Sequence, residues 1–312
     1  MRAPALPPQM RVFVRDWLSA NNVVLKSRDG HVVIDSGYSR HVPLTLALIA
    51  SRQGLDGEPL ARLVNTHCHS DHMGGNAALA RAYGCPIAIP EGEAPLIARW
   101  DTRALLLNYA DQVADPFDVG EILHPGSTYR WGDLDWQALA APGHDAGALV
   151  FYNAEHRILV SGDALWENGY GFVMPREMDP AALPATRATL EMLAVLDVHV
   201  VIPGHGEPFC GYNAALDRAL ARTAAFEADS HRVARHALKV VLTFALLDRQ
   251  RMPRSELPAY VDRVEIYREF NARFFRMPAP ALAEWLLAET RKAGAIDLDG
   301  DDLVPSRRAM AA

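Results

Sequence analysis

Five histidines and two aspartates gather in four short segments of the chain, and each segment follows or ends an apolar run. The segments read THCHSDHMGG, APGHDAG, LVSGDALW and VIPGHGEPF, and they carry His67, His69, Asp71, His72, His144, Asp163 and His205. Neutral imidazole and carboxylate groups are the ligands that suit zinc and its first-row neighbours. Three histidines and an aspartate so close together would crowd positive charge at low pH without any gain in packing. The pattern therefore predicts a site that holds two metal ions.

The residues around these ligands fit the same interpretation. Neighbouring glycines let the backbone turn sharply at each segment. Cys68 alternates to the side opposite its two histidine neighbours, so we expect it to pack in the interior. The remaining histidines lie outside the cluster and are given no role in the site: His31, His41, His124, His156, His199, His231 and His236.

A two-metal site of this kind implies hydrolysis without a serine or cysteine nucleophile. Two ions about 3.5–4 Å apart can share a hydroxide, because each lowers the pKa of bound water toward about 7. One ion can polarise a scissile carbonyl or phosphoryl oxygen while the other holds the leaving group. Asp71 is the expected catalytic residue, since it could both bind metal and accept a proton.

Strand and helix patterns alternate through the first two thirds of the chain. Strand-like runs lie at 22–27, 31–37, 61–65, 86–90, 128–141, 148–162 and 199–203. Helical patterns lie at 42–53, 74–84, 91–114 and 180–196, and Asp179 is expected to cap the last of them. Strand clusters separated by helices, twice over, predict a layered α/β domain.

The pattern changes after Tyr212, where strand signals stop. A long helical register runs over 213–250, two further helical pieces follow at 255–264 and 280–294, and a short hairpin turns at Asp299–Gly300. This order of elements is the layout of a winged helix. We therefore expect two domains, a catalytic domain over 1–229 and a helical, winged-helix-like domain over 230–312.

The ordered segments resemble the signature of the metallo-β-lactamase superfamily over about residues 12–230. The resemblance implies an αββα sandwich with the metals at the edge between its two sheets. It also implies a division of the ligands: a first metal held by His67, His69 and His144, a second held by Asp71, His72 and His205, and a bridge made by Asp163.

Departures from the family pattern indicate which branch of the superfamily this chain resembles. True β-lactamases carry Cys or Ser where this chain has Asp163, and diiron flavoproteins carry glutamate in place of His69. The bridging aspartate is typical of glyoxalase II and of the lactonase, phosphodiesterase and endoribonuclease branches. Phe172 and Met174 fall where glyoxalase II has the groups that grip glutathione, so hydroxyacylglutathione is not the favoured substrate.

Three other functions remain open. The winged-helix-like tail is similar to that of a branch that includes single-strand endoribonucleases and phosphodiesterases. Two features disfavour a nucleic-acid substrate. The acidic wing residues would repel phosphates, and the aromatic face has a helical spacing that suits a core. These residues are Asp297, Asp299, Asp301 and Asp302 in the wing and Tyr267, Phe270, Phe274 and Phe275 in the aromatic face. Persulfide dioxygenases share much of the histidine set but use one iron, and the full second set of ligands in this chain disfavours that function. A metal-dependent binding module without enzyme activity has little support.

Two segments are expected to line the cleft and to determine which substrate binds. The first covers 94–114; the second covers 165–178 and supplies the pocket residues Trp166, Tyr170, Phe172 and Met174. An apolar cleft suits an acyl thioester, ester or lactone better than a polyanion. The sequence therefore predicts a dinuclear hydrolase with two Zn²⁺ ions, in a site that could also take Fe or Mn, acting on a small molecule.

The composition of the chain indicates its general class, its partners and its location. The chain has 312 residues, is 50% hydrophobic and carries a net charge of −7, which describes a globular protein and a poor partner for nucleic acid or anionic membranes. No apolar run is long enough to span a bilayer, and the first ten residues hold no apolar signal segment. Three cysteines make no disulfide framework, so a cytoplasmic location is expected. The apolar surface of the tail should pack on the sandwich or form a homodimer.

Overall fold

The computed structural model describes residues 4–310, and its strands form three sheets. The first sheet contains β1 (Met10–Phe13), β2 (Asn22–Leu25), β3 (His31–Ile34), β4 (Leu60–Val64), β5 (Ile87–Pro90) and β6 (Glu121–Leu123) in that order. The second contains β11 (Val200–Pro203), β10 (Ile158–Gly162), β9 (Leu149–Asn153), β8 (Leu134–Ala140) and β7 (Thr128–Trp131). The third contains β12 (Met252–Pro253), β14 (Asp302–Pro305) and β13 (Ile296–Asp299).

The helices fall between and after these strands. Those of the first 229 residues are α1 (Val42–Ala50), α2 (Ser70–Met73), α3 (Asn76–Tyr83), α4 (Ala94–Ala98), α5 (Leu107–Ala110), α6 (Ala182–Leu193) and α7 (Tyr212–Ala228). The later ones are α8 (Ser230–Arg249), α9 (Leu257–Arg263), α10 (Glu265–Phe270), α11 (Ala279–Lys292) and α12 (Arg307–Met310). Over residues 4–310 no helix has the length and apolarity that a membrane crossing requires.

Each main sheet has apolar side chains on both faces. In β2, Val23 and Leu25 face the second sheet while Val24 packs with the helices on the outside. This alternation follows from strand geometry, in which successive side chains point to opposite faces. The two faces explain why the strands read as continuous apolar runs.

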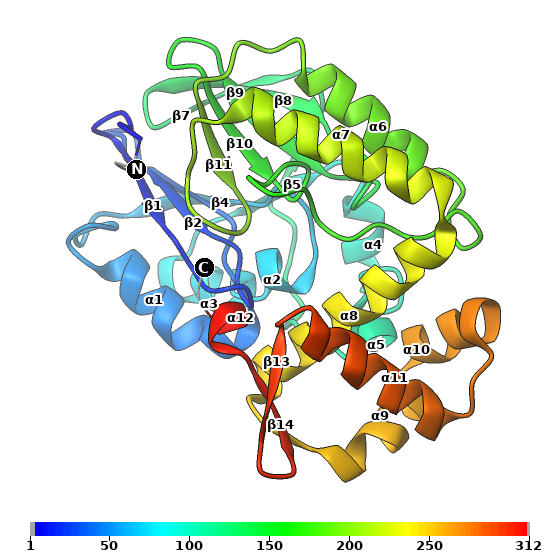
Figure 1. Ribbon diagram of the computed structural model, residues 1–312. Coiled ribbons are helices and arrows are strands. Elements are labelled where there is room, and N and C mark those ends of the chain that lie inside the picture. The colour runs from blue at the N-terminus through cyan, green and yellow to red at the C-terminus, as the bar shows by residue number, and fades with distance from the viewer. Residues whose placement is uncertain (1–3, 311–312) are drawn as a thin grey trace.

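The sheets stack face to face, and helices cover both outer faces (Figure 1). Trp136 and Phe151 of the second sheet meet Ile34 of the first in the central core. Outside the first sheet lie α1, α3 and α4, and outside the second lie α6 and α7. The αββα sandwich expected from the family resemblance is confirmed.

Ladder directions place the ligand segments at one edge of the sandwich. Strands β3, β4, β5 and β6 run parallel, as do β10 and β11. The ligand-bearing loops follow β4, β8, β10 and β11, so they leave their strands near the same edge. Loops after the carboxyl ends of parallel strands meet at one edge of a sheet, and that edge is where a ligand site forms.

The C-terminal helices form a separate core that also takes in residues of the sandwich. Leu242 of α8 and Phe270 of α10 pack in one cluster with Tyr109 and Ala110 of α5. The hydroxyl of Tyr109 donates to Glu269 of α10 at 2.9 Å. The apolar face of the tail is therefore covered within the same chain, on the sandwich.

Three local expectations differ from the structure. The segment 94–114 is two short helices, α4 and α5, separated by turns in which Trp100 and Leu106 have left-handed backbone conformations. Helix α6 begins at Ala182, so Asp179 is not its cap and instead accepts a hydrogen bond from the backbone N–H of Ala181. The register over 213–250 is two helices, because the extended backbone of Asp229 ends α7 and its carboxylate caps α8.

Candidate metal centre

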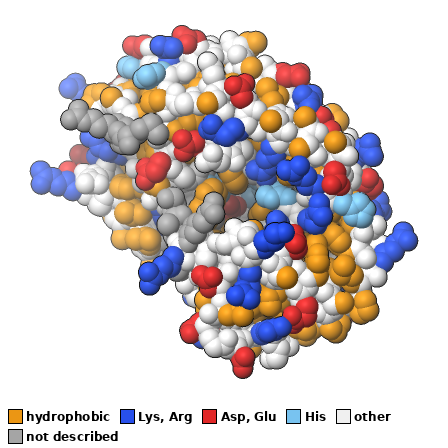
Figure 2. Space-filling model, viewed as in Figure 1, with side chains coloured by type: hydrophobic (Ala, Val, Ile, Leu, Met, Phe, Trp, Pro, Cys, Tyr) orange, Lys and Arg blue, Asp and Glu red, His pale blue; other side chains and the backbone are white. Residues whose placement is uncertain are grey.

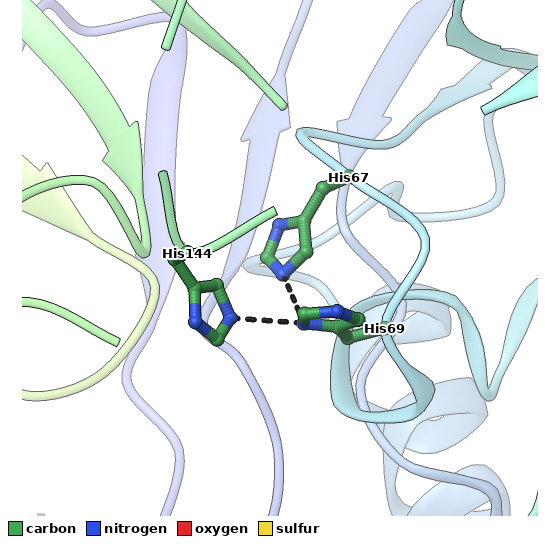
Figure 3. Close-up of side chains that lie close together, drawn as sticks. All are labelled: His67, His69 and His144. Carbon is green, nitrogen blue, oxygen red and sulfur yellow. Dashed lines mark hydrogen bonds between the residues drawn. The ribbon is translucent and has the colours of Figure 1, made fainter. Parts of the chain in front are cut away.

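Three histidines from two loops converge on one point. His67 and His69 follow β4 and His144 follows β8, and their rings turn toward one another (Figure 3). The Nε2 of His67 lies 3.1 Å from the Nδ1 of His69, which lies 2.9 Å from the Nε2 of His144. Three ring nitrogens therefore face one small volume.

A second group lies beside the first and contains Asp71, His72, Asp163 and His205. One ligand atom from each of these side chains lies within 4.8 Å of the others. The Nε2 of His205 is 3.0 Å from the Oδ2 of Asp71, and the Nε2 of His72 is 3.3 Å from the Oδ1 of Asp163. All four residues are buried or nearly so, although they carry or can carry charge.

Asp163 faces both groups. Its Oδ2 lies 3.5 Å from the Nε2 of His144 in the first group and 3.9 Å from the Nε2 of His205 in the second. Gly204 makes room for this carboxylate, since a Cβ at that position would lie 2.2 Å from the Oδ1 of Asp163. The segment after β11 therefore needs glycine before His205 because a larger residue would collide with this carboxylate.

The protonation states suit metal binding in the first group. Burial, with His72 and His69 close by, holds the pKa of His67 well below its usual value. Burial and the neighbouring His144 lower the pKa of His69 to about 4. Both imidazoles are neutral at physiological pH, so each keeps a lone pair on a ring nitrogen, as a metal ligand must.

Carboxylates dominate the electrostatics of the second group. Burial opposes ionisation of Asp163, yet His72 and His205 hold the pKa of its carboxyl well below the usual range. For His72, burial lowers the pKa, but Asp35 and Asp163 outweigh it and raise the pKa well above the usual value. The group thus concentrates negative charge that a cation would balance.

Two carboxylates outside the ligand set orient the histidines, and the sequence motifs did not identify them. Asp35, directly after β3, lies 2.8 Å from the Nδ1 of His72 and accepts hydrogen bonds from the N–H and hydroxyl of Thr66. Asp145 lies 3.5 Å from the Nε2 of His69. Such partners fix the tautomer and direction of a ligating ring. The only sequence signal for Asp35 is a carboxylate at a strand end.

The donor set fits divalent cations. The Nε2 of His72 is buried and makes no well-aligned hydrogen bond among the described residues, although it lies 3.3 Å from the Oδ1 of Asp163. Unpaired buried nitrogens are costly in a folded protein. Because His72 donates its Nδ1 hydrogen to Asp35, its Nε2 is directed at the remaining carboxylates of the group, where a cation would satisfy it.

A cavity of about 400 Å³ opens beside the two groups. Its walls include His69, Asp71, His144, Asp163 and His205 from the metal centre, and Trp17, Trp166 and Phe172 from nearby loops. Helix α8 adds Val240, Thr243, Phe244 and Leu247 to the lining. The C-terminal region therefore takes part in enclosing the cavity, which lies in the hollow visible near the centre of Figure 2.

The four residues expected to line the pocket divide between three places. Trp166 and Phe172 line the cavity, and the backbone carbonyl of Phe172 also accepts a hydrogen bond from the Nδ1 of His144 at 2.5 Å. Tyr170 is buried in the core under the second sheet, with its hydroxyl bonded to Thr223. Met174 lines a different cavity, next to α5 and α10.

Comparisons with known proteins agree with this architecture. The sequence model described as the metallo-beta-lactamase superfamily matches residues 15–205. A hydroxyacylglutathione hydrolase of Bdellovibrio bacteriovorus is 31% identical over 36% of this chain, and the match spans only 37% of that enzyme. The acyl-coenzyme A thioesterase MBLAC2 of Gallus gallus is 24% identical over 63% of this chain and 76% of its own length.

Solved structures resemble the chain over nearly its whole length. A metallo-beta-lactamase family protein of Thermus thermophilus has a TM-score of 0.57 and 20% identity, and the match covers 96% of this chain and 100% of that one. A beta-lactamase domain protein of Burkholderia ambifaria has a TM-score of 0.56 and 20% identity, covering 97% of this chain and 93% of that one. At such identities the likeness shows the fold alone, and it extends through the C-terminal helices.

Proposed function

Because the chain belongs to the metallo-beta-lactamase superfamily, we propose that it is a dinuclear metal-dependent hydrolase acting on an apolar thioester, ester or lactone. The observation that carries the proposal is the position of Asp163, whose carboxylate faces two separate donor groups at the wall of one cavity. A single tetrahedral site would use fewer ligands than the seven that meet here.

The donor groups define what each residue would hold. The first group would bind one cation through three imidazole nitrogens, the second would bind another through Asp71, His72 and His205, and Asp163 would contribute to both. Two divalent cations, most simply Zn²⁺, would lower the pKa of water and polarise the scissile bond. Asp71 borders the cavity with its carboxylate and is placed to accept a proton there.

The substrate class follows from the walls of the cavity. The cavity offers mainly apolar surface beside the donor groups, contributed by Trp166, Phe172, Val240, Phe244 and Leu247. Such walls suit the acyl chain of a small molecule. The relatives support a thioester in particular, since one is named for hydroxyacylglutathione and another for acyl-coenzyme A.

The proposal also covers the two domains and the C-terminal tail, residues 230–312. We assign residues 1–229 to the catalytic domain and 230–312 to a winged-helix-like domain whose first helix, α8, closes the cavity. Asp299 and Asp302 of its hairpin pair with Arg251, which gives nucleic acid no basic wing to bind. Cys68, Cys85 and Cys210 are free thiols, as suits the cytoplasm.

Metal analysis followed by a substrate panel tests the function. Gently purified protein should contain two metal ions per chain and hydrolyse medium-chain acyl thioesters, esters or lactones. Asp163→Asn should lower kcat by orders of magnitude while the fold is kept, because the variant loses the negative charge between the two cation positions. Asp135→Asn, an exposed residue paired with Arg130, is the matched control and should turn over normally.

Three outcomes would contradict the proposal. One iron per chain with an empty second site, together with oxygen uptake on a persulfide, would indicate the dioxygenase instead. Cleavage of single-stranded RNA or a phosphodiester in preference to every acyl substrate would indicate the endoribonuclease or phosphodiesterase. Full turnover by Asp163→Asn at normal metal content would show that the carboxylate does not serve both cations.

A further inference from the structure

One end of the cavity is basic although the metal centre is acidic. Arg222 of α7 and His236 and Lys239 of α8 line the same cavity as the donor groups. His236 and Lys239 are three residues apart on one face of α8, so both side chains are directed to the same side of the helix. Figure 2 shows Lys, Arg and His side chains gathered along one side of the central hollow.

Within residues 4–310, the neighbours of the Arg222 guanidinium are aromatic rings and a histidine, with no acidic partner. Its guanidinium lies over the rings of Tyr170 and Phe226, with distances of 4.9 and 5.1 Å to the ring centres. A Cβ at Gly169 would lie 2.4 Å from its Nη1, so the loop is shaped around this side chain. Burial lowers the pKa of Arg222, but a guanidinium stays charged at neutral pH. Among residues 4–310 it forms no ion pair.

His236 is neutral and contributes hydrogen bonding rather than charge. Burial, with Arg222 and Lys239 close by, lowers its pKa to about 3. Its Nε2 accepts a hydrogen bond from Arg222. In a neutral ring the proton then lies on Nδ1, which leaves His236 one donor of its own.

Lys239 is the second cation of this part of the cavity. No carboxylate pairs with its ammonium group in the described part of the chain. Nearby arginines differ in this respect: Arg187 pairs with Glu227, and Arg235 pairs with Asp229. Two cations without a carboxylate partner within residues 4–310 lie beside a neutral histidine in the cavity that also contains the metal centre, so this part of the cavity has positive charge to offer an anion.

We propose that Arg222 and Lys239 form a subsite for an oxyanion, a carboxylate or a phosphate, on the part of the substrate away from the scissile bond. The inference rests on the proposed function and deepens it: the substrate is an acyl compound with an anionic group. Arg222 would bind the oxyanion through its planar fork and Lys239 would bind it as a point charge. The apolar walls would hold the chain between the two ends.

Binding of non-hydrolysable thioethers tests the subsite directly. S-octyl thioethers of 3-mercaptopropionate, 2-mercaptoethyl phosphate and neutral 3-mercaptopropionamide share the chain and differ in the end group. Calorimetry on the metal-loaded protein should give a Kd for at least one anionic compound about 10- to 100-fold below that of the amide. The carboxylate and phosphate arms show which oxyanion is preferred.

Three variants of the two cations and one control variant test whether Arg222 and Lys239 cause this preference. Arg222→Gln and Lys239→Met should each reduce the ratio of anionic to neutral affinity at least about tenfold. Arg222→Lys keeps charge without the planar fork and should restore part of the ratio. Arg235→Gln removes an exposed arginine of α8 that does not line the cavity and should leave the ratio unchanged. A preference that survives in both Arg222→Gln and Lys239→Met would mean that the metals bind the anion, and the subsite would be refuted.

Hydrolysis assays test the anion subsite and the proposed hydrolase function separately. The octanoyl thioesters of the same three thiols should show the same order in kcat/KM. Turnover of all three at equal rates, with equal thioether affinities, would refute the subsite and keep the hydrolase. Selective binding of anionic thioethers without turnover of any thioester or ester would keep the subsite and refute the hydrolase.

Discussion

The indole Nε1 of Trp166 donates a hydrogen bond to the Oδ1 of Asp163 at 3.2 Å. The same indole ring lies edge-on to the rings of Trp17 and His205, with ring centres 5.3 and 5.4 Å away. Trp166 thus holds the carboxylate that faces both donor groups and packs against a ligand of the second. A hydrogen bond to a carboxylate that would bind metal sets the direction and basicity of that carboxylate.

Trp166→Phe should keep the aromatic packing and remove this one donor. We expect the affinity for the second metal ion to fall about 10- to 100-fold, because partners of this kind contribute that much at metal sites. Competition with a chelator, followed by metal analysis, measures the change without relying on activity. Trp100→Phe is the matched control, since Trp100 packs on Phe117 away from the centre. Equal metal affinities in wild type and Trp166→Phe would contradict the assigned role.

Asp35→Asn should weaken the second site by a different route. Asp35 accepts from His72 and from Thr66, and its charge raises the pKa of His72. The amide can keep the shape but not the charge, so the direction and basicity of the Nε2 of His72 should suffer. We expect an affinity loss of about 10- to 100-fold for one of two metal ions. Asp16→Asn, beside His41 and outside the donor groups, should bind both ions normally.

The seven side chains of the two donor groups could be singled out in the sequence because each one lies shortly after the end of a strand. The polarity pattern marks those strand ends, and parallel strands bring their carboxyl ends together at one edge of a sheet. The orienting carboxylate of Asp35 was not predictable, since it reaches His72 from β3 through tertiary contact alone. His236 was given no role for the same reason: it belongs to no local motif, and only the packing of α7 on α8 brings Arg222 to it.

The segment over 94–114 shows where local pattern fails. Its apolar residues suit a helix, but Trp100, Leu106 and Asp111 adopt left-handed backbone conformations that end each helical stretch. Such conformations cost non-glycine residues energy and persist only where packing compensates. Here α5 gains the contact of Tyr109 with the C-terminal core. A sequence-based helix prediction cannot include that contact.

Acid should destabilise the fold partly through His236. Its pKa of about 3 in the folded chain is below the value of 6.5 for an ordinary histidine, so between these values the unfolded chain binds more protons. The stability due to this group is complete above pH 6.5 and is lost as pH falls toward 3. The free energy of unfolding should therefore fall between pH 7 and pH 5 more steeply in wild type than in His236→Gln, by up to about 1 kcal/mol per pH unit. Parallel pH dependences from denaturant titrations would contradict the neutral state of His236.

Filling the cavity from α8 should shorten the substrates that the protein accepts. Val240 is half-buried and lines the cavity together with Phe172. Val240→Trp adds a large ring to that wall while the donor groups keep their ligands. Each methylene of bound chain contributes about 0.8 kcal/mol when buried, so displacement of a few methylenes should lower kcat/KM for long acyl chains about tenfold or more. Short acyl chains, which do not reach the new ring, should lose much less.

A series of thioesters from acetyl to decanoyl measures this shift as a move of the optimum toward shorter chains. Val195→Trp is the matched control, because Val195 is 83% exposed and does not line the cavity. Its chain-length profile should coincide with that of wild type. A uniform loss at every chain length in Val240→Trp would indicate damage to folding, which thermal unfolding would reveal. An unchanged profile in folded, metal-loaded Val240→Trp would show that acyl chains bind outside the cavity and that α8 does not set substrate length.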